Sequence, residues 1–171
     1  MGMAEFLISS VTVGAGGASS IDFTSIPSTY TDLRLVVSLR SGSSGTSRGL
    51  SFTLNNDAGT NYSTRYFYGY ASGVTGGSTS SSTDMYSGLY GGTSYGANIF
   101  SNIEIYIPNY ASSNNKSVSV DSASENTSST NYIGFWAGYW AQTSAITGIS
   151  LKGSLAFIPN STAYLYGIKN S

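Results

Sequence analysis

The sequence predicts an all-β fold: an antiparallel, jelly-roll-like β-sandwich of about eight to ten strands. Strand-favouring Val, Ile, Thr, Tyr, Phe and Trp are plentiful, whereas Glu, Lys and Gln are scarce. Several segments alternate apolar and polar residues, and turn residues separate them at roughly ten-residue spacing. No stretch keeps a helical period. The 171 residues are most simply one domain, 1–171, with a core large enough to fold without disulfides.

The clearest strand is Asp32–Arg40. Its apolar side chains fall at Leu33, Leu35, Val37 and Leu39, and the alternate positions include Arg34, Ser38 and Arg40. This period of two is typical of a strand with one face in a core and the other in water. Just upstream, Pro27 holds Ile26 in an extended conformation, so Ser25–Thr31 is expected to be the turn that leads into the strand.

The other strands of the first half follow in order. Phe6–Val13 is apolar and β-branched, and a Gly-rich break ends it. Ser20–Phe23 is a short extended piece with apolar residues on one face. Gly49–Leu54 alternates apolar with hydroxyl side chains. The turn residues Asn55–Gly59 then reverse the chain into Tyr62–Tyr70, an aromatic strand.

The middle of the chain, at about 71–97, is rich in Gly, Ser, Thr and Tyr. We expect it to be a long loop, because it lacks apolar alternation, with room for one short strand at Met85–Tyr90. Loops of this length in a compact domain are often functional.

Five more strands are expected in the second half. Asn98–Ile107 alternates Ile with polar residues, and Pro108 ends it. Ser117–Ala123 is a thin polar strand, and Tyr132–Trp140 is the most aromatic one. Ile146–Phe157 places apolar residues on one face, and Thr162–Ile168 is last. The loops between these strands are very unequal in length, which favours a jelly roll over an up-and-down barrel.

Composition excludes several functions. The chain has no His and no Cys, so it can form neither a Ser-His-Asp triad, nor a Cys-His pair, nor a metal centre of these residues. We expect no cofactor. Its net charge of −1, with only 9% charged residues, argues against nucleic-acid binding. No apolar run is long enough to span a membrane, and MGMAEFLISS lacks the features of a signal peptide, so we expect a protein that is made in a cytoplasm and not exported by a signal peptide.

A glycosidase would need a pair of carboxylates across a sugar cleft. The acidic residues are Glu5, Asp22, Asp32, Asp57, Asp84, Glu104, Asp121 and Glu125. Asp121 and Glu125 lie close in sequence but flank a turn, where solvated carboxylates are ordinary. Asn55–Gly59 lacks the length and the closing Glu of an EF-hand loop. We therefore expect a protein that is not an enzyme.

The aromatic residues are the main candidates for an interaction surface. Tyr86, Tyr90 and Tyr95 are interleaved with Gly and Ser, a mixture that adaptable recognition surfaces use. Trp136 and Trp140 lie on a strand with aromatics on both faces, so at least one face is expected to be covered by a loop or another subunit. The other reading is that these rings simply pack in the sandwich.

Three segments resemble a family of small all-β virion proteins of tailed bacteriophages. They are IDFTSIPSTYTDLRLVVSLRS, the FTLNND hairpin and SLKGSLAFIPNSTAYLYGI. The residues that carry the resemblance are Ile21, Phe23, Ile26, Pro27, Tyr30, Asp32, Leu33, Tyr164, Tyr166, Gly167 and Ile168. The family is similar to jelly-roll or sandwich modules of capsid decoration (cement) proteins and of tail-fibre proteins.

The resemblance implies a non-enzymatic structural protein located in the virion. We expect a cement protein that binds the major capsid protein as a homo-oligomer, with a trimer favoured, because the first expected strand leaves no room for a fibre shaft. Arg34 and Arg40 are then expected contacts to a capsid neighbour. The alternative is a tail or tail-fibre module that binds a host glycan through the loop carrying Tyr86, Tyr90 and Tyr95.

Overall fold

The computed structural model describes residues 3–45, 47–126 and 131–170. Over these residues the chain forms twelve β-strands and one short 3-10 helix. The strands are β1 (Met3–Thr12), β2 (Ala18–Phe23), β3 (Asp32–Leu39), β4 (Arg48–Leu54), β5 (Tyr62–Tyr70), β6 (Gly73–Ser82), β7 (Met85–Tyr90), β8 (Ser101–Ile107), β9 (Lys116–Ser124), β10 (Tyr132–Trp140), β11 (Ile149–Phe157) and β12 (Thr162–Asn170), and the helix is η1 (Thr93–Tyr95).

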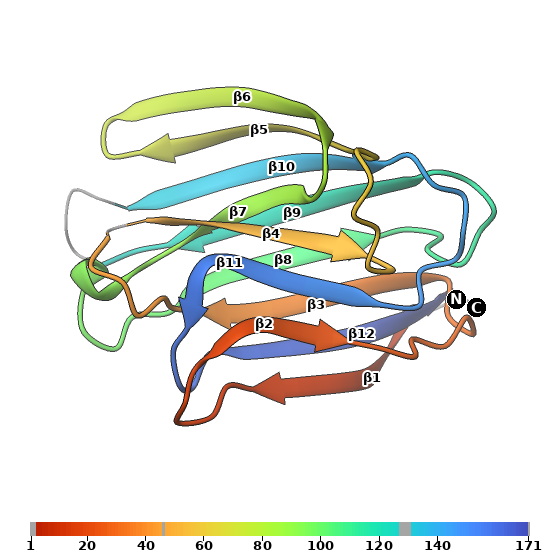
Figure 1. Ribbon diagram of the computed structural model, residues 1–171, viewed down its shortest axis with the longest axis horizontal. Coiled ribbons are helices and arrows are strands. Elements are labelled where there is room, and N and C mark those ends of the chain that lie inside the picture. The colour runs from red at the N-terminus through yellow and green to blue at the C-terminus, as the bar shows by residue number, and fades with distance from the viewer. Residues whose placement is uncertain (1–2, 46, 127–130, 171) are drawn as a thin grey trace.

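The strands form two sheets packed as a sandwich (Figure 1). The larger has the order β1-β12-β3-β8-β9-β10-β5-β6, and the smaller has the order β2-β11-β4-β7. Neighbouring strands are antiparallel in both sheets. The expected all-β sandwich is therefore confirmed, with more strands in the described residues than the eight to ten expected.

The core lies between the two sheets. Alternate residues of β3 are its clearest part, since Leu33, Leu35, Val37 and Leu39 are all buried. Leu50, Phe52 and Leu54 of β4 face them from the smaller sheet, also fully buried. The alternation in the sequence thus predicts the buried face of these strands correctly, because burying one face of a pleated strand removes every second side chain from water.

The expected long loop at about 71–97 is instead largely strand. It contains β6, β7 and η1, so the expected loop is wrong, whereas the short strand expected at Met85–Tyr90 is confirmed as β7. β6 pairs only with β5 and forms one edge of the larger sheet, and most of its residues are exposed. An exposed edge strand is held by backbone hydrogen bonds and needs no apolar alternation, which is why its sequence, GVTGGSTSSS, looked like a loop.

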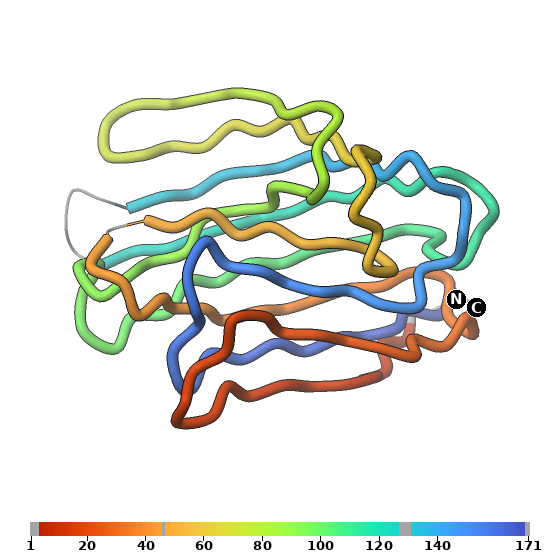
Figure 2. The backbone as a smooth tube through the Cα atoms, viewed as in Figure 1, coloured from red at the N-terminus to blue at the C-terminus, as the bar shows by residue number. Residues whose placement is uncertain are grey.

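The two edges of the larger sheet lie at opposite ends of the molecule. The backbone tube in Figure 2 shows β5 and β6 at one end, and the first and last strands, β1 and β12, side by side at the other. The larger sheet has an outer face, turned away from the smaller sheet, that no other element of the described residues covers. Both candidate surfaces described next lie on this sheet.

Candidate binding surfaces on the eight-stranded sheet

The first surface lies on the outer face of β9, β10, β5 and β6. Along β10 the residues alternate strictly between buried and exposed, with Trp136 and Trp140 buried and Phe135 and Tyr139 exposed. Phe135 pairs in register with Asp121 of β9 on one side and with Phe67 of β5 on the other. The Phe67 and Phe135 rings lie 5.5 Å apart, and 54% and 46% of these side chains are exposed.

Two adjoining hollows follow these strands, and we call them together the aromatic groove. One, of about 370 Å³, is lined by Arg65, Tyr66, Phe67, Ser119, Val120, Asp121, Phe135, Trp136 and Ala137. The other, of about 430 Å³, is lined by Ser63, Thr64, Arg65, Ser78, Thr79, Ser80, Ala137, Gly138 and Tyr139. Arg65 and Ala137 belong to both, so the hollows meet where Ala137 leaves space between two larger rings of β10.

The groove carries two charged side chains that are free to bind a ligand. Arg65 and Asp121 are both exposed, and within the described residues neither forms an ion pair or a side-chain hydrogen bond. Arg65 pairs in register with Ala137, and Asp121 with Phe135, so the charges lie on either side of β10. Their opposite signs leave the groove without net charge.

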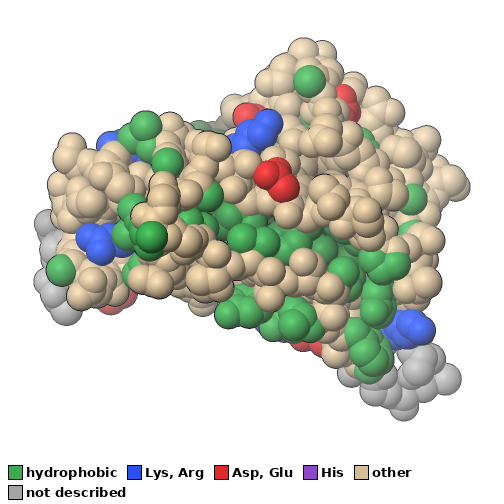
Figure 3. All heavy atoms as spheres, turned by 60° about the horizontal axis from the view of Figure 1, so that its bottom comes forward, with side chains coloured by type: hydrophobic (Ala, Val, Ile, Leu, Met, Phe, Trp, Pro, Cys, Tyr) green, Lys and Arg blue, Asp and Glu red, His purple; other side chains and the backbone are tan. Residues whose placement is uncertain are grey.

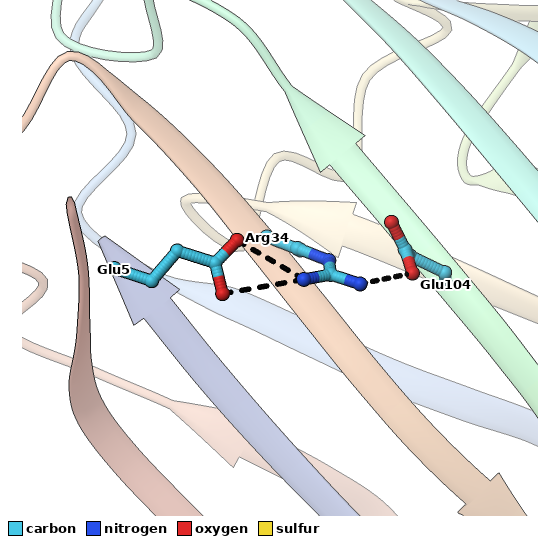
Figure 4. A network of polar contacts seen from close by, with 3 residues as sticks. All are labelled: Glu5, Arg34 and Glu104. Atoms are coloured by element: carbon cyan, nitrogen blue, oxygen red, sulfur yellow. Dashed lines mark hydrogen bonds and ion pairs between the residues drawn. The ribbon is translucent and has the colours of Figure 1, made fainter. Parts of the chain in front are cut away.

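Arg34, by contrast, is ion-paired within the chain. Its Nη1 lies 3.0 Å from Glu5 Oε1, and its Nη2 lies 2.7 Å from Glu104 Oε2 (Figure 4). The hydrogen bond to Glu104 is the largest of the effects that raise the pKa of Arg34. The network joins β1, β3 and β8 across the outer face. Arg34 does lie on the outer face as expected, but with its charge already neutralised by two carboxylates.

A buried end of β10 anchors the strand that carries the groove. Trp140 Nε1 donates a 2.7 Å hydrogen bond to Asp57 Oδ2, and that carboxylate also accepts hydrogen bonds from Asn61 and the Gly59 backbone. The bond from Trp140 is the largest cause that lowers the pKa of Asp57. Trp140 also stacks on Tyr62 of β5, with ring centroids 6.3 Å apart. Trp140 therefore fixes β10 against β5 and the hairpin turn before it.

The structure corrects most of the expected interaction surface. Tyr90, Tyr95, Trp136 and Trp140 are buried in the core, so they cannot form an exposed surface. Tyr86 is half-buried, its ring edge-on to Tyr66 at 5.2 Å, and burial raises its pKa to about 12. The reading in which these rings pack in the sandwich is the right one, because β7 is a strand of the smaller sheet that packs against β9 and β10 of the larger sheet and is not part of a loop.

Arg40 is also buried, contrary to the expected outer-face position. The strand ends at Leu39, and Arg40 forms an isolated bridge with Gly91. Its Nη2 donates to the Thr93 carbonyl oxygen at 3.5 Å. The alternation of buried and exposed residues stops where β3 ends, at Leu39. Extending this alternation by one residue therefore predicted an exposed position for Arg40, which is buried.

The second surface lies on the first strand, at the opposite edge of the same sheet. Phe6 and Leu7 of β1 are 45% and 56% exposed, and Tyr164 of the neighbouring β12 is also exposed. We call these three residues at the open edge the β1 patch; Phe6 and Leu7 are consecutive on the strand and point to opposite faces of the sheet, with Phe6 beside the Tyr30 ring and Leu7 on the same outer face as Tyr164. Figure 3, which brings this side forward, shows hydrophobic side chains gathered in a band across it. The outer edge of β1 pairs with no strand of the described chain, so its backbone is free as well.

The described residues hold no group of three or more acidic side chains that could bind a metal ion. Nor do they form a helix long and apolar enough to cross a membrane.

No family model matches the chain, and no curated protein matches it. Among solved structures, the Caenorhabditis elegans galectin LEC-6 is 9% identical, with a TM-score of 0.38 over 94% of this chain and 96% of that chain. Mouse laminin alpha1 chain, domains LG4-5, is 9% identical, with a TM-score of 0.31 over 93% of this chain and 41% of that chain.

Several exposed residues of the aromatic groove and of the β1 patch do not follow from the sequence pattern. The sequence pattern predicts no surface role for Arg65, Phe67, Phe6 or Leu7, whereas Phe135 and Tyr139 belong to the aromatic strand for which both a packed and an exposed reading were open. The signal was present in Tyr132–Trp140, where aromatics on both faces required that one face be uncovered or covered from outside. What the sequence did not show is which face; the larger Trp rings turn inward because they bury the most apolar area.

Proposed function

We propose that the protein is a non-enzymatic structural protein of a tailed-bacteriophage virion, a capsid decoration (cement) protein that binds the shell. The sequence resemblance in Ile21–Ser41 and Ser150–Ile168 suggests this class of protein. The observation that carries the proposal is the β1 patch, where exposed Phe6 and Leu7 lie on a strand whose outer edge has no partner in the described chain.

The β1 patch is suited to a protein partner. Exposed large apolar side chains on both faces of an edge strand are available to a partner that wraps around that edge, and an open strand edge can accept a strand of the partner. We propose that the major capsid protein covers this edge, and that the cement protein acts as a symmetric oligomer, with a trimer favoured. The added interface stabilises the shell by mass action, since it forms only on the assembled head.

The test uses phage heads that lack this protein. Purified wild type should bind them and raise the temperature at which they rupture. The double substitution Phe6→Ser with Leu7→Ser should weaken binding at least tenfold. Val74→Ser is the matched control, because Val74 is an exposed apolar residue on the opposite edge strand, β6. Heads that bind neither protein, or that bind wild type and the double variant equally, would refute the proposal.

The tail-module alternative is not supported by the residues that suggested it. It required Tyr86, Tyr90 and Tyr95 on an exposed loop, and Tyr90 and Tyr95 are buried. A glycan site, if the chain has one, must lie elsewhere.

A further inference from the structure

We propose that the aromatic groove binds a neutral oligosaccharide. This inference is independent of the β1 patch and of any place in a virion. It assigns a ligand to the outer face of β9, β10, β5 and β6, which neither the fold nor the proposed attachment edge uses.

Two rings of β10 provide stacking surfaces. Phe135 and Tyr139 both point outward and are exposed, and Ala137 lies between them. Residues four apart on a strand are about 13 Å apart, longer than one pyranose ring. The apolar faces of successive sugar rings can therefore rest on Phe135 and Tyr139 while the chain crosses above Ala137. Phe67 widens the platform at the Phe135 end, since the two Phe rings are in contact.

Polar groups line the same groove in the cross-strand row that contains Ala137. Register pairing places Ser119, Ala137, Arg65 and Ser78 in one row across β9, β10, β5 and β6. Arg65 supplies only donors, Asp121 only acceptors, and serine hydroxyls supply both. A sugar hydroxyl donates and accepts at once, so this mixture suits a neutral polyol. The Tyr139 hydroxyl is held by Asn115 Nδ2 at 2.6 Å, which fixes that ring.

The groove is built on rigid elements. β9, β10 and β5 are paired along their whole lengths, with no bulge between β10 and either neighbour. Trp136 lies beneath the floor, buried and packed between Tyr66 and Tyr68 at 6.2 Å from each. The volumes of the two hollows fall within the range of small-molecule sites. Binding would therefore need little reordering of the protein.

The charges of the groove select this ligand over others. A polyanion needs several basic residues, and the groove has one, Arg65, with Asp121 nearby to oppose it. An apolar protein partner would strip water from both charges without replacing their hydrogen bonds, which is costly. A neutral oligosaccharide satisfies the charged groups and the rings together.

The test is titration of the whole protein with malto-, cello-, manno-, galacto- and chitohexaose, monitored by the combined fluorescence of the two tryptophans, Trp136 and Trp140, and by calorimetry. A heparin hexasaccharide is the acidic comparison. We expect at least one neutral hexasaccharide to bind, with Phe135→Ser and Tyr139→Ser each raising its Kd at least tenfold. Arg65→Met should raise Kd about fivefold. Leu7→Ser, an equally exposed apolar position on β1, should leave Kd unchanged.

Three results would overturn the inference: no neutral hexasaccharide binds at millimolar concentration, only heparin binds, or the Phe135→Ser and Tyr139→Ser variants bind as tightly as wild type. All of these substitutions are at exposed positions, and a thermal melt of each variant separates lost binding from lost folding. None of the outcomes depends on binding to phage heads, so the failure of one proposal is distinguishable from the failure of the other.

Discussion

Phe135 of β10 and Phe67 of β5 lie opposite each other in the register of the larger sheet, with their rings in contact and about half of each exposed to solvent. Cross-strand aromatic pairs stabilise a sheet even at the surface. A double-mutant cycle with Phe67→Ala and Phe135→Ala should therefore give a coupling of about 0.5–1 kcal/mol in the free energy of unfolding. Each single variant should lose about 1 kcal/mol or less, and strictly additive losses would show that the rings do not interact in solution.

Arg34 should contribute to stability through its two carboxylates. Arg34→Met leaves Glu5 and Glu104 without their partner, and because all three side chains are partly exposed we expect a loss of about 1 kcal/mol or less. The loss should shrink in high salt, which screens the pair. Arg65→Met is the control, since Arg65 has no partner in the described chain and its removal should leave the denaturant midpoint unchanged. Equal losses for the two variants would contradict this account.

The alternation of apolar and polar residues predicts the sandwich and the buried face of strands such as β3 and β8, because burial of one sheet face imposes that period. β6 was missed because an edge strand is defined by backbone pairing with β5, not by its side chains. The aromatic groove was missed for a different reason. It depends on which non-adjacent strands are neighbours, and the order β9-β10-β5-β6 brings Asp121, Phe135 and Arg65 together without any local pattern.

Asp57 should make part of the stability depend on pH. Its pKa is lowered in the folded protein, so the carboxylate stabilises the fold above its unfolded pKa of about 3.9. That contribution is lost as pH falls through the lower folded value. Asp57→Asn should cost about 1–2 kcal/mol at pH 7, and the difference between wild type and variant should begin to shrink as the pH falls below about 4.

Chemical denaturation across this pH range measures the effect of Asp57→Asn. The control is Asp121→Asn, which removes an exposed carboxylate with no partner among the described side chains and should leave the free energy of unfolding at pH 7 unchanged. A wild-type and variant difference that stays constant from pH 7 to below pH 4 would mean that the hydrogen bond from Trp140 does not favour the ionised carboxylate.

Gly138 should tolerate no side chain. A Cβ at this inward position of β10 would lie 2.1 Å from Met85 Sδ of β7. Gly138→Ala forces Met85 out of its buried place, and we expect a loss of about 1–3 kcal/mol. Gly14→Ala, where a Cβ meets nothing within 4 Å, is the steric control. Unfolding midpoints that are the same for both variants would show that β7 does not pack on β10 as described.

We propose that the protein is part of a virion and binds its capsid shell, and this proposal has a direct test. The most direct measurement is cryo-EM of the phage that encodes it, compared with the same phage after deletion of the gene. We predict extra density at regular, symmetry-related positions on the head, with the β1 edge against the major capsid protein, and none of this density in the deletion. Density confined to the tail, or virions of identical structure with and without the gene, would contradict the claim.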